Sequence, residues 1–360
     1  MVPLDVREHV PLSPLSTLGV GGPARHYVRV SDDDQVRAAV DWARARGLPL
    51  LVLGGGSNVV LSDEGHPGLV MHLASRGVAA RPGPDRVTLT AEAGEPWDAL
   101  AASAVEEGWA GFECLSGIPG LVGATPIQNV GAYGQEVSET VNDVEALDLR
   151  TGRLERLAAA ECAFAYRDSR FKSADRDRFI VLRVTYALRP GGRPAVRYAE
   201  LARHLEEKGV AEPSLGDVRE AVLALRRRKS MVLDPADPDA RSVGSFFTNP
   251  IVPAAAADAL EATLRREGAL REGERPPRFP AGDGAVKLSA AWLIERAGLA
   301  KGYRRGNVGL SSRHTLAIVN RGGAAAAEVV ALAREVRDRV RARFGITLVP
   351  EPVLVNLSID

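Results

Sequence analysis

The stretch SGIPGLVGATPIQNVGAYGQE at residues 116–136 is unusually rich in glycine. Its glycines let the backbone adopt positive φ values and approach a ligand closely, while Pro119 and Pro126 disfavour a continuous helix or a central strand. We therefore predict a loop that lines a ligand site. Taken alone, this composition is more often that of a surface connection, so the prediction needs support from elsewhere in the chain.

A second glycine-rich segment, GGGSN at residues 54–58, follows an apolar run of buried-strand length at 48–53. Consecutive backbone N–H groups and a serine hydroxyl at the end of a strand suit a phosphate or pyrophosphate. The segment is not a P-loop, because no Gly-Lys-[Ser/Thr] follows, and a plain β-turn is an equal alternative. Together the two loops predict one elongated ligand with a phosphate end and a flat end, and flavin adenine dinucleotide (FAD) fits that description.

The overall composition is that of an ordinary folded protein. The 360 residues are 45% hydrophobic and 26% charged, which allows two or three domains. Lys+Arg and Asp+Glu both number 46, so no net field draws the chain to nucleic acid or membrane. We expect small-molecule partners, no nucleic acid and no membrane. The sequence does not determine the oligomeric state, and we expect a monomer.

Neither a metal site nor a disulfide framework is expected. Cys114 and Cys162 lie far apart without a CxxC motif, and the six histidines never fall at i, i+4. The chain shows no basic start followed by an apolar run, and no apolar span of membrane length. We therefore expect a soluble cytoplasmic protein.

Hydrophobic periodicity predicts alternating strands and helices around the two loops, followed by a separate α+β lobe over 252–344. The predicted helices cover residues 32–47, 96–108, 214–229, 254–267, 288–297 and 324–344. The predicted strands cover residues 26–30, 48–53, 86–94, 141–149, 178–188, 316–320 and 346–356.

Five motifs occur in a fixed order. They are GGGSN (54–58), the 116–136 stretch, AYRDSRFK (165–172), GSFFTNP (244–250) and VPEP (349–352). With these motifs, the chain from Leu18 to Val355 resembles the UDP-N-acetylenolpyruvoylglucosamine reductase (UDP-N-acetylmuramate dehydrogenase) family, flavoenzymes of peptidoglycan precursor synthesis. The resemblance implies an α+β protein with an FAD-binding fold of the vanillyl-alcohol-oxidase type, built from two α/β subdomains, and a C-terminal α+β substrate-binding lobe. We place subdomain 1 at residues 1–75, joined by the C-terminal strand at 346–360, subdomain 2 at 76–230, and the lobe at 231–345.

The resemblance also implies the cofactor and the reaction. NADPH is the co-substrate, and hydride passes from NADPH to N5 of FAD and then to C3 of UDP-N-acetylglucosamine enolpyruvate. GGGSN would hold the pyrophosphate, and the 116–136 stretch would hold the isoalloxazine and ribityl portions. The implied cofactor-binding residues are Gly54, Gly55, Gly56, Ser57, Asn58, Gly117, Ile118, Pro119, Gly120, Gly123, Ala124, Gln128, Asn129, Gly131, Ala132 and Tyr133.

Three residues would carry the implied chemistry, and each has an ordinary structural alternative. Arg167 is typical of an ion pair with its neighbour Asp168, Ser245 of a turn hydroxyl, and Glu351 of a sheet edge between prolines. In the family, Arg167 and Glu351 would lie at the substrate carboxylate and stabilise an enolate, with Glu351 protonated or sharing a proton. Ser245 would then donate a proton to C2.

The implied substrate-binding residues are Tyr198, Arg226, Lys229 and Asn249. From the sequence alone, the two basic residues are most often part of a solvated helix end, and Tyr198 is equally typical of a half-buried tyrosine at a helix entry. Many relatives carry lysine where this chain has Thr248, so one charge of the lobe is missing. Two other functions stay open: a different FAD oxidase or dehydrogenase, and a nucleotide-binding module without activity.

Overall fold

The computed structural model describes residues 3–360, and these form two compact units. Unit 1 contains the chain up to Leu15, Gly22–Ser57 and Glu64–Asp234. Unit 2 contains Ser16–Gly21, Asn58–Asp63 and Pro235–Asp360, so the chain passes between the units more than once. Both units combine helices with sheets, which confirms the α+β class. The three-part division at residues 1–75, 76–230 and 231–345 stays a prediction.

The first sheet of unit 1 has the strand order β1-β2-β5-β3, in which β2, β5 and β3 are parallel and β1 is antiparallel to β2. Helix α1 packs its apolar stripe into the core of this region. The helix begins where the Asp32 carboxylate accepts a hydrogen bond from the Gln35 N–H, as its sequence predicts. The elements are β1 (Arg7–Pro11), β2 (Pro23–Val30), α1 (Asp33–Arg44), β3 (Leu50–Leu53) and β5 (His66–Leu73).

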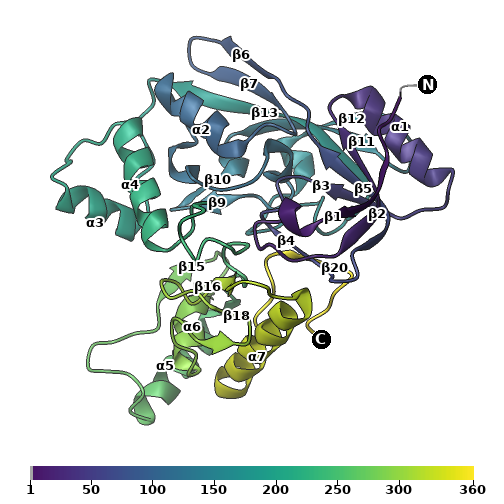
Figure 1. The fold of residues 1–360 in the computed structure, drawn as a ribbon. Helices are drawn as coiled ribbons and strands as arrows, with labels where there is room; N and C mark the ends of the chain where they lie inside the picture. The colour runs from purple at the N-terminus through teal and green to yellow at the C-terminus, as the bar shows by residue number, and fades with distance from the viewer. Residues whose placement is uncertain (1–2) are drawn as a thin grey trace. The chain divides into compact units, whose positions relative to one another are not determined.

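The second sheet of unit 1 is antiparallel and has the order β12-β11-β13-β7-β6, with β8 paired to β13. Helix α2 lies beside β7 and β13 (Figure 1), and its Trp97 contacts the rings of Phe112 and Tyr186. The elements are β6 (Val78–Pro82), β7 (Val87–Glu92), α2 (Trp97–Glu106), β8 (Trp109–Ala110), β11 (Val141–Asp148), β12 (Leu154–Ala158) and β13 (Phe179–Pro190).

The remaining elements of unit 1 surround the 116–136 stretch. Its tip forms a small hairpin of β9 (Gly131–Ala132) and β10 (Gln135–Glu136). Helices α3 (Ala199–Glu207) and α4 (Leu215–Arg228) form a hairpin that buries Leu201, Val218 and Cys114 in a common cluster (Figure 1). Short 3-10 turns occur at Ser13–Leu15, Glu113–Leu115, Val122–Ala124, Val137–Glu139 and Ala159–Cys162.

Unit 2 contains three small sheets and three helices around one apolar cluster. The sheets have the orders β14-β16-β15, β17-β18-β19 and β20-β4, and the last pair is parallel. Leu18 and Val60, from early in the chain, belong to the same core as Val336 of α7. The elements are β4 (Val59–Leu61), β14 (Ile251–Pro253), α5 (Ala254–Arg266), β15 (Arg278–Pro280), β16 (Ala285–Leu288), α6 (Ala290–Arg296), β17 (Arg304–Arg305), β18 (Val308–Leu310), β19 (Ile318–Asn320), α7 (Ala326–Phe344) and β20 (Val353–Val355).

One predicted strand is much shorter than expected. The pattern at 346–356 predicts a continuous strand, but β20 contains only Val353–Val355. Pro350 and Pro352 explain the difference, because proline has no backbone N–H to donate to a sheet.

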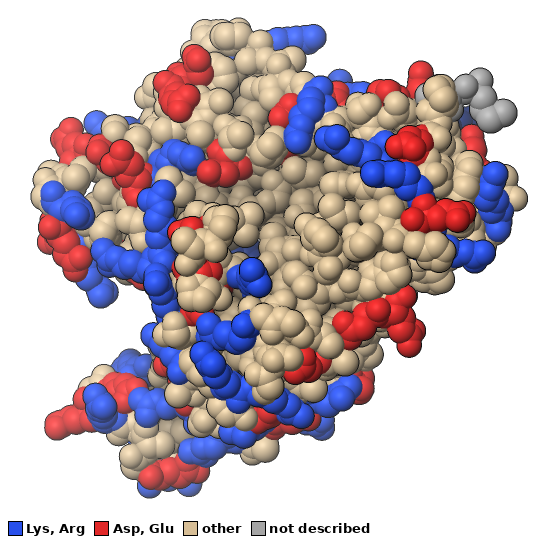
Figure 2. All heavy atoms as spheres, in the orientation of Figure 1, with Lys and Arg blue, Asp and Glu red and all other residues tan. Residues whose placement is uncertain are grey.

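The surface carries both charges. On the face shown in Figure 2, basic and acidic side chains are interspersed, in agreement with their equal numbers. Within residues 3–360, no helix has the length and apolar character needed to span a membrane.

Candidate active site

The two glycine-rich loops predicted from the sequence lie against each other through residues of unit 1. The Ser57 hydroxyl donates a hydrogen bond to the Pro119 carbonyl oxygen at 3.0 Å. A Cβ atom at Gly55 would lie 2.9 Å from the Gly120 Cα, and one at Gly120 would lie 2.8 Å from the Ser57 Oγ. Gly120 also has a φ of 120°, a value that L side chains rarely adopt. Only glycine at these positions lets the two backbones approach this closely and present peptide groups to one site.

The start of the 116–136 stretch is held by a clamp on the peptide groups of Gly117. Its N–H donates to an Asp98 carboxylate oxygen at 2.6 Å, and its carbonyl accepts from the Arg226 Nε at 3.3 Å. Arg219 donates two hydrogen bonds to Asp98, at 2.7 and 3.1 Å. Burial would raise the pKa of Asp98, but the bonds from Arg219 and Gly117 outweigh it and lower that pKa. The turn at Gly117, where φ is 72°, is therefore anchored from both sides.

Arg226, predicted as a substrate-binding residue, points its guanidinium into the protein. Besides its bond to Gly117, it donates to the Met231 carbonyl at 2.7 Å. Burial lowers the pKa of this guanidinium. In the structure Arg226 thus stabilises the loop, and its contact with substrate stays a prediction.

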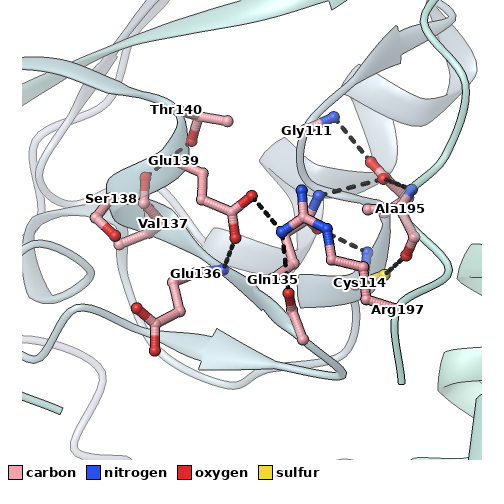
Figure 3. A network of polar contacts seen from close by, with 12 residues as sticks. Gly111, Cys114, Gln135, Glu136, Val137, Ser138, Glu139, Thr140, Ala195 and Arg197 are labelled. Atoms are coloured by element: carbon pink, nitrogen blue, oxygen red, sulfur yellow. Dashed lines mark hydrogen bonds and ion pairs between the residues drawn. The ribbon is translucent and has the colours of Figure 1, made fainter. Parts of the chain in front are cut away.

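The far end of the stretch is tied to the segment that precedes α3, as Figure 3 shows. The Cys114 N–H donates to the Gln135 Oε1 at 3.0 Å, and the Cys114 thiol donates to the Ala195 carbonyl at 3.0 Å. Arg197 donates to the Glu139 carboxylate at 2.8 Å. These contacts fix the hairpin of β9 and β10 beside the segment that leads to Tyr198.

A buried carboxylate underlies this network. Glu113 is 1% exposed and accepts hydrogen bonds from the Gly111 N–H (2.8 Å), the Gln135 amide (3.2 Å) and the Ala195 N–H (2.9 Å). Burial, followed by the charge of Glu113, raises the pKa of Cys114 to about 12. Cys114 is therefore a neutral thiol that donates a hydrogen bond, not an activated nucleophile.

Arg167 stands in a tight turn of unit 1, beside the 116–136 stretch. Ala165 and Asp168 exchange two backbone hydrogen bonds, at 3.0 and 3.1 Å, with Tyr166 and Arg167 between them. Arg167 has a φ of 56°, in the left-handed region that a non-glycine residue adopts only when its surroundings compensate. Its Nη2 donates to the Gly131 carbonyl at 2.5 Å, and Lys172 donates to the Arg167 carbonyl at 3.0 Å. The structure thus brings Arg167 together with the predicted flavin loop.

The tip of the loop meets the helical hairpin through Tyr133. The rings of Tyr133 and Tyr198 are 5.6 Å apart in an edge-to-face contact, and the Lys229 ammonium lies 5.7 Å from the centre of the Tyr133 ring. The same ammonium donates to the Glu200 carboxylate at 2.6 Å. Tyr198 and Lys229, predicted to contact the substrate nucleotide, are therefore brought together at one point of unit 1.

Ser245 and Glu351 lie on paired segments of unit 2. The Glu351 N–H donates to the Phe246 carbonyl at 2.9 Å, and Phe247 pairs with Pro350 in an antiparallel bridge. Sequence patterns do not reveal this pairing, because the two segments are more than 100 residues apart in the chain. The proposed convergence of Arg167 with these two residues stays a prediction.

The other residues predicted in the lobe make backbone contacts. The Thr248 N–H donates to the Val349 carbonyl at 3.0 Å, and the Asn249 side chain accepts a hydrogen bond from the Ala290 N–H at 2.9 Å. Asn58 belongs to unit 2, where its carbonyl accepts from the Val353 N–H at 3.0 Å. The remaining predicted cofactor-binding residues lie on the two loops of unit 1, namely Gly54, Gly56, Ile118, Gly123, Ala124, Gln128, Asn129 and Ala132.

Several residues that hold the site are not apparent from the sequence. Asp98, Glu113 and Lys172 support the loops through the contacts described above. A weak signal exists for Glu113, because an acid inside the apolar run GFECLS is either exposed or satisfied by buried donors. Asp98 and Lys172 have no such signal, since charged residues in helices and turns are ordinarily solvated.

Comparison with known proteins identifies the family. Residues 24–158 match the FAD binding domain, and residues 235–355 match the C-terminal domain of UDP-N-acetylenolpyruvoylglucosamine reductase. The reductase of Saccharopolyspora erythraea is 54% identical over 97% of this chain and 95% of its own length. The chain belongs to the UDP-N-acetylenolpyruvoylglucosamine reductase family. The family member of Thermobifida fusca is 52% identical over 98% of both chains.

A solved structure of the same reductase family agrees with the fold. The enzyme from Thermus caldophilus has a TM-score of 0.63 and 25% identity, with 98% of this chain and 99% of that chain covered. As a member of the reductase family, the chain is an FAD-containing oxidoreductase. The close approach of Gly55 to Gly120 fits such a cofactor, because it brings the peptide groups of two glycine-rich loops together, and such peptide groups can hold phosphates.

Proposed function

We propose that this chain reduces UDP-N-acetylglucosamine enolpyruvate to UDP-N-acetylmuramate with NADPH. The observation that carries the proposal is the Arg167 turn, whose guanidinium is hydrogen-bonded to Gly131 within the glycine-rich loop of an FAD-containing reductase. FAD, when bound, supplies the hydride transfer that no side chain can perform. GGGSN would hold its pyrophosphate, and the loop from Gly117 to Tyr133 would hold the flavin and ribityl portions.

Arg167 is proposed to bind the substrate carboxylate. When a hydride adds to C3 of the enolpyruvyl ether, the electrons of the C2–C3 double bond move toward C2 and onto the carboxylate, and an enolate forms. This increase in negative charge makes a neighbouring guanidinium more favourable in the transition state than in the ground state. The planar guanidinium of arginine can donate to both oxygens of a carboxylate at once, whereas the ammonium of lysine lacks this matched geometry.

Ser245 is proposed to donate a proton to C2 of the enolate. A hydroxyl is a weak acid, but the enolate is a strong base, and the serine recovers its proton from solvent afterwards. The overall addition is therefore one hydride at C3 and one proton at C2. Glu351, on the segment paired with that of Ser245, would contribute at the same carboxylate in its protonated form or through a shared proton.

Lys229 and Tyr198 are proposed to contact the nucleotide part of the substrate. The Lys229 ammonium and the Tyr198 ring both lie at Tyr133, so a phosphate bound there would meet a cation next to the flavin loop. Arg226 and Asn249 are proposed as further contacts, in addition to the loop and helix contacts that they make in the structure.

Anaerobic stopped-flow spectroscopy of Ser245→Ala tests the mechanism. Reduction of the bound flavin by NADPH should stay close to wild type, while reoxidation by the enolpyruvyl nucleotide should slow by about 10²–10⁴-fold, as for loss of a general acid. Ser358→Ala, a serine near the C-terminus, serves as the control and should change neither half-reaction. Equal losses in both half-reactions of Ser245→Ala would argue against the assignment.

The same instrument separates the alternative functions. A nucleotide-binding module would not oxidise NADPH at all. A different FAD enzyme would become reduced, but the enolpyruvyl nucleotide would not reoxidise it.

A further inference from the structure

Asn129 is a buried amide at the centre of the contact between the glycine-rich loop and the Arg167 turn. Its side chain is 1% exposed. The Nδ2 donates to the Ala165 carbonyl at 2.9 Å and to the Glu136 carboxylate at 2.9 Å. The Oδ1 accepts from the Ser138 N–H at 3.1 Å. One side chain therefore joins the turn to the second strand of the hairpin, at Glu136, and to the 3-10 turn that follows it, at Ser138.

The Ala165 carbonyl is also one of the two acceptors that close the turn. It accepts from the Asp168 N–H at 3.1 Å, and the Ala165 N–H donates back to Asp168 at 3.0 Å. Arg167 lies inside this closed turn with a φ of 56°. Because such a backbone is strained for arginine, the contacts around the turn must stabilise it. The Asn129 amide donates its hydrogen bond to the same Ala165 carbonyl that closes the turn.

A second contact fixes the turn a few residues further on. The Ser169 hydroxyl donates to the Ile127 carbonyl at 2.7 Å. The turn is therefore attached to the loop by three hydrogen bonds, those of Arg167 with Gly131, Ser169 with Ile127 and Asn129 with Ala165. Of the three loop residues, Asn129 is the one whose side chain also bonds to two other residues of the loop. Loss of the hydrogen bond from Asn129 to Ala165 would thus shift the Arg167 side chain relative to the loop, while Arg167 itself stays present.

We infer that Asn129 is a positioning residue that holds the Arg167 guanidinium in register with the glycine-rich loop. This inference rests on the role proposed for Arg167 at the substrate carboxylate. Asn129 acts through Arg167 and not through contact with the reacting atoms, because its polar atoms are engaged by Ala165, Glu136 and Ser138.

The chemistry of the amide explains why asparagine stands here. The Ala165 carbonyl and the Glu136 carboxylate both need donors, and the amide nitrogen of Asn129 supplies two N–H groups. The amide oxygen accepts the hydrogen bond from the Ser138 N–H. An aspartate has the same shape and tolerates the φ of 45° found at this position, but it donates to neither acceptor when ionised. Asn129→Asp therefore changes donors to acceptors with little change in volume.

The test is a double-mutant cycle on the full-length flavoprotein. Asn129→Asp should slow reoxidation by the enolpyruvyl nucleotide by about 10²-fold, the loss typical of a displaced catalytic group, and this loss should be larger than any change in flavin reduction by NADPH. In an Arg167→Ala background the same substitution should have almost no further effect, because the group that it positions is gone. Additive losses would overturn the inference. Asn142→Asp, which likewise removes an amide bond to a carboxylate, is the matched control.

A second variant separates positioning from stability. Asn129→Asp with Glu136→Gln exchanges the amide and the carboxylate, so the pair between these residues is restored while the bond to Ala165 is not. We expect this double variant to recover the thermal stability lost in Asn129→Asp but not the reoxidation rate. Recovery of both would show that Asn129 acts only through Glu136, contrary to the inference.

Hydrogen exchange gives a readout that does not depend on activity. The Asp168 N–H, which donates to Ala165, should exchange faster in Asn129→Asp and at the wild-type rate in Asn142→Asp, with or without FAD. Unchanged exchange would overturn the inference. If Arg167→Ala reoxidised at the wild-type rate, the proposed role of Arg167 would be wrong, and the exchange result would still decide whether Asn129 holds the turn.

Discussion

Ser57 and Pro119 are joined by a hydrogen bond of 3.0 Å, although 62 residues separate them in the chain. The bond joins the loop after β3 to the glycine-rich stretch that begins at Ser116, and it lies beside the close approach of Gly55 to Gly120. The two loops are therefore one structural unit, and a change in either should affect the cofactor held by both.

Gly55→Ala should separate the loops. Its new methyl would lie 2.9 Å from the Gly120 Cα, a contact that requires the backbone to move. We expect the free energy of unfolding to fall by about 1–3 kcal/mol, the usual result of overpacking, and the affinity for FAD to fall tenfold or more. The change can be measured by titrating the apoprotein with FAD. Gly54→Ala is the control, because its methyl would lie at an ordinary contact distance of 3.7 Å from Leu121. It should leave the contact between the loops unchanged or stabilise it. Equal melting temperatures for the two apoproteins would contradict the prediction.

Arg167→Lys should impair substrate reduction while sparing the cofactor. The lysine keeps the charge but loses the fork of donors that reaches Gly131 and would reach a carboxylate. We expect the reoxidation half-reaction to slow by about 10²–10³-fold, as for removal of one donor to a developing anion, with a normal flavin content. Arg170→Lys, at a neighbouring arginine paired with Asp175, is the control for altered charge chemistry near the turn. A normal reoxidation rate in Arg167→Lys would refute the bidentate role.

Glu200→Gln should tighten binding of the nucleotide substrate. In the structure Glu200 holds the Lys229 ammonium at 2.6 Å, so a phosphate must compete with a carboxylate for this cation. Both side chains are about one-third exposed, and such pairs contribute up to about 1 kcal/mol, so the KM for the UDP-sugar should fall by about two- to fivefold at low salt. Steady-state kinetics at two ionic strengths measures the effect, which salt should weaken. A raised KM would show that Glu200 supports the site.

Asp148→Asn should change the acid stability of unit 1. Asp148 is fully buried and accepts hydrogen bonds from Arg178 and from the Arg150 N–H, both at 2.8 Å. The bond from Arg178 lowers the pKa of Asp148 below its usual value, although burial opposes this. A lowered pKa in the folded state contributes stability above the unfolded value of about 4, and this contribution is lost as the pH falls through the folded pKa.

The melting temperature of the wild type should therefore exceed that of Asp148→Asn at pH 7, and the difference should shrink below about pH 4. Thermal unfolding followed over this pH range provides the measurement. Asp5→Asn, at an aspartate whose side chain is 88% exposed, should track the wild type throughout. A constant difference between wild type and Asp148→Asn at every pH would exclude this explanation.

Local signals in the sequence predict the longer elements well. The caps at Asp32 and Ser214 and the glycine at Gly345 lie where α1, α4 and α7 begin or end. Helix α3 and the strand β1 are missing from the predictions, because neither is bordered by strong signals. The short strands β14 to β16 depend on pairing between distant segments, which periodicity does not report.

The site is only partly visible in the sequence. Glycine density marks both loops, since their backbone contacts exclude side chains at Gly55 and Gly120. The clamp of Asp98 and Arg226 on Gly117 is invisible, because it joins three segments by hydrogen bonds that no spacing encodes. The pairing of the Glu351 and Phe246 segments is hidden for the same reason. Tertiary contacts therefore determine the support of the site, while local composition determines its lining.

The discontinuous make-up of unit 2 bears on synthesis at the ribosome. Its core includes Leu18 and Val60, which are translated early, and Val336, which is translated more than 270 residues later. The early segments lack their final apolar partners until α7 has been translated, so the core of this unit cannot be completed before that point. A truncated chain that starts at Pro235 would lack the strand that pairs with β20, and it would expose an open sheet edge that promotes aggregation.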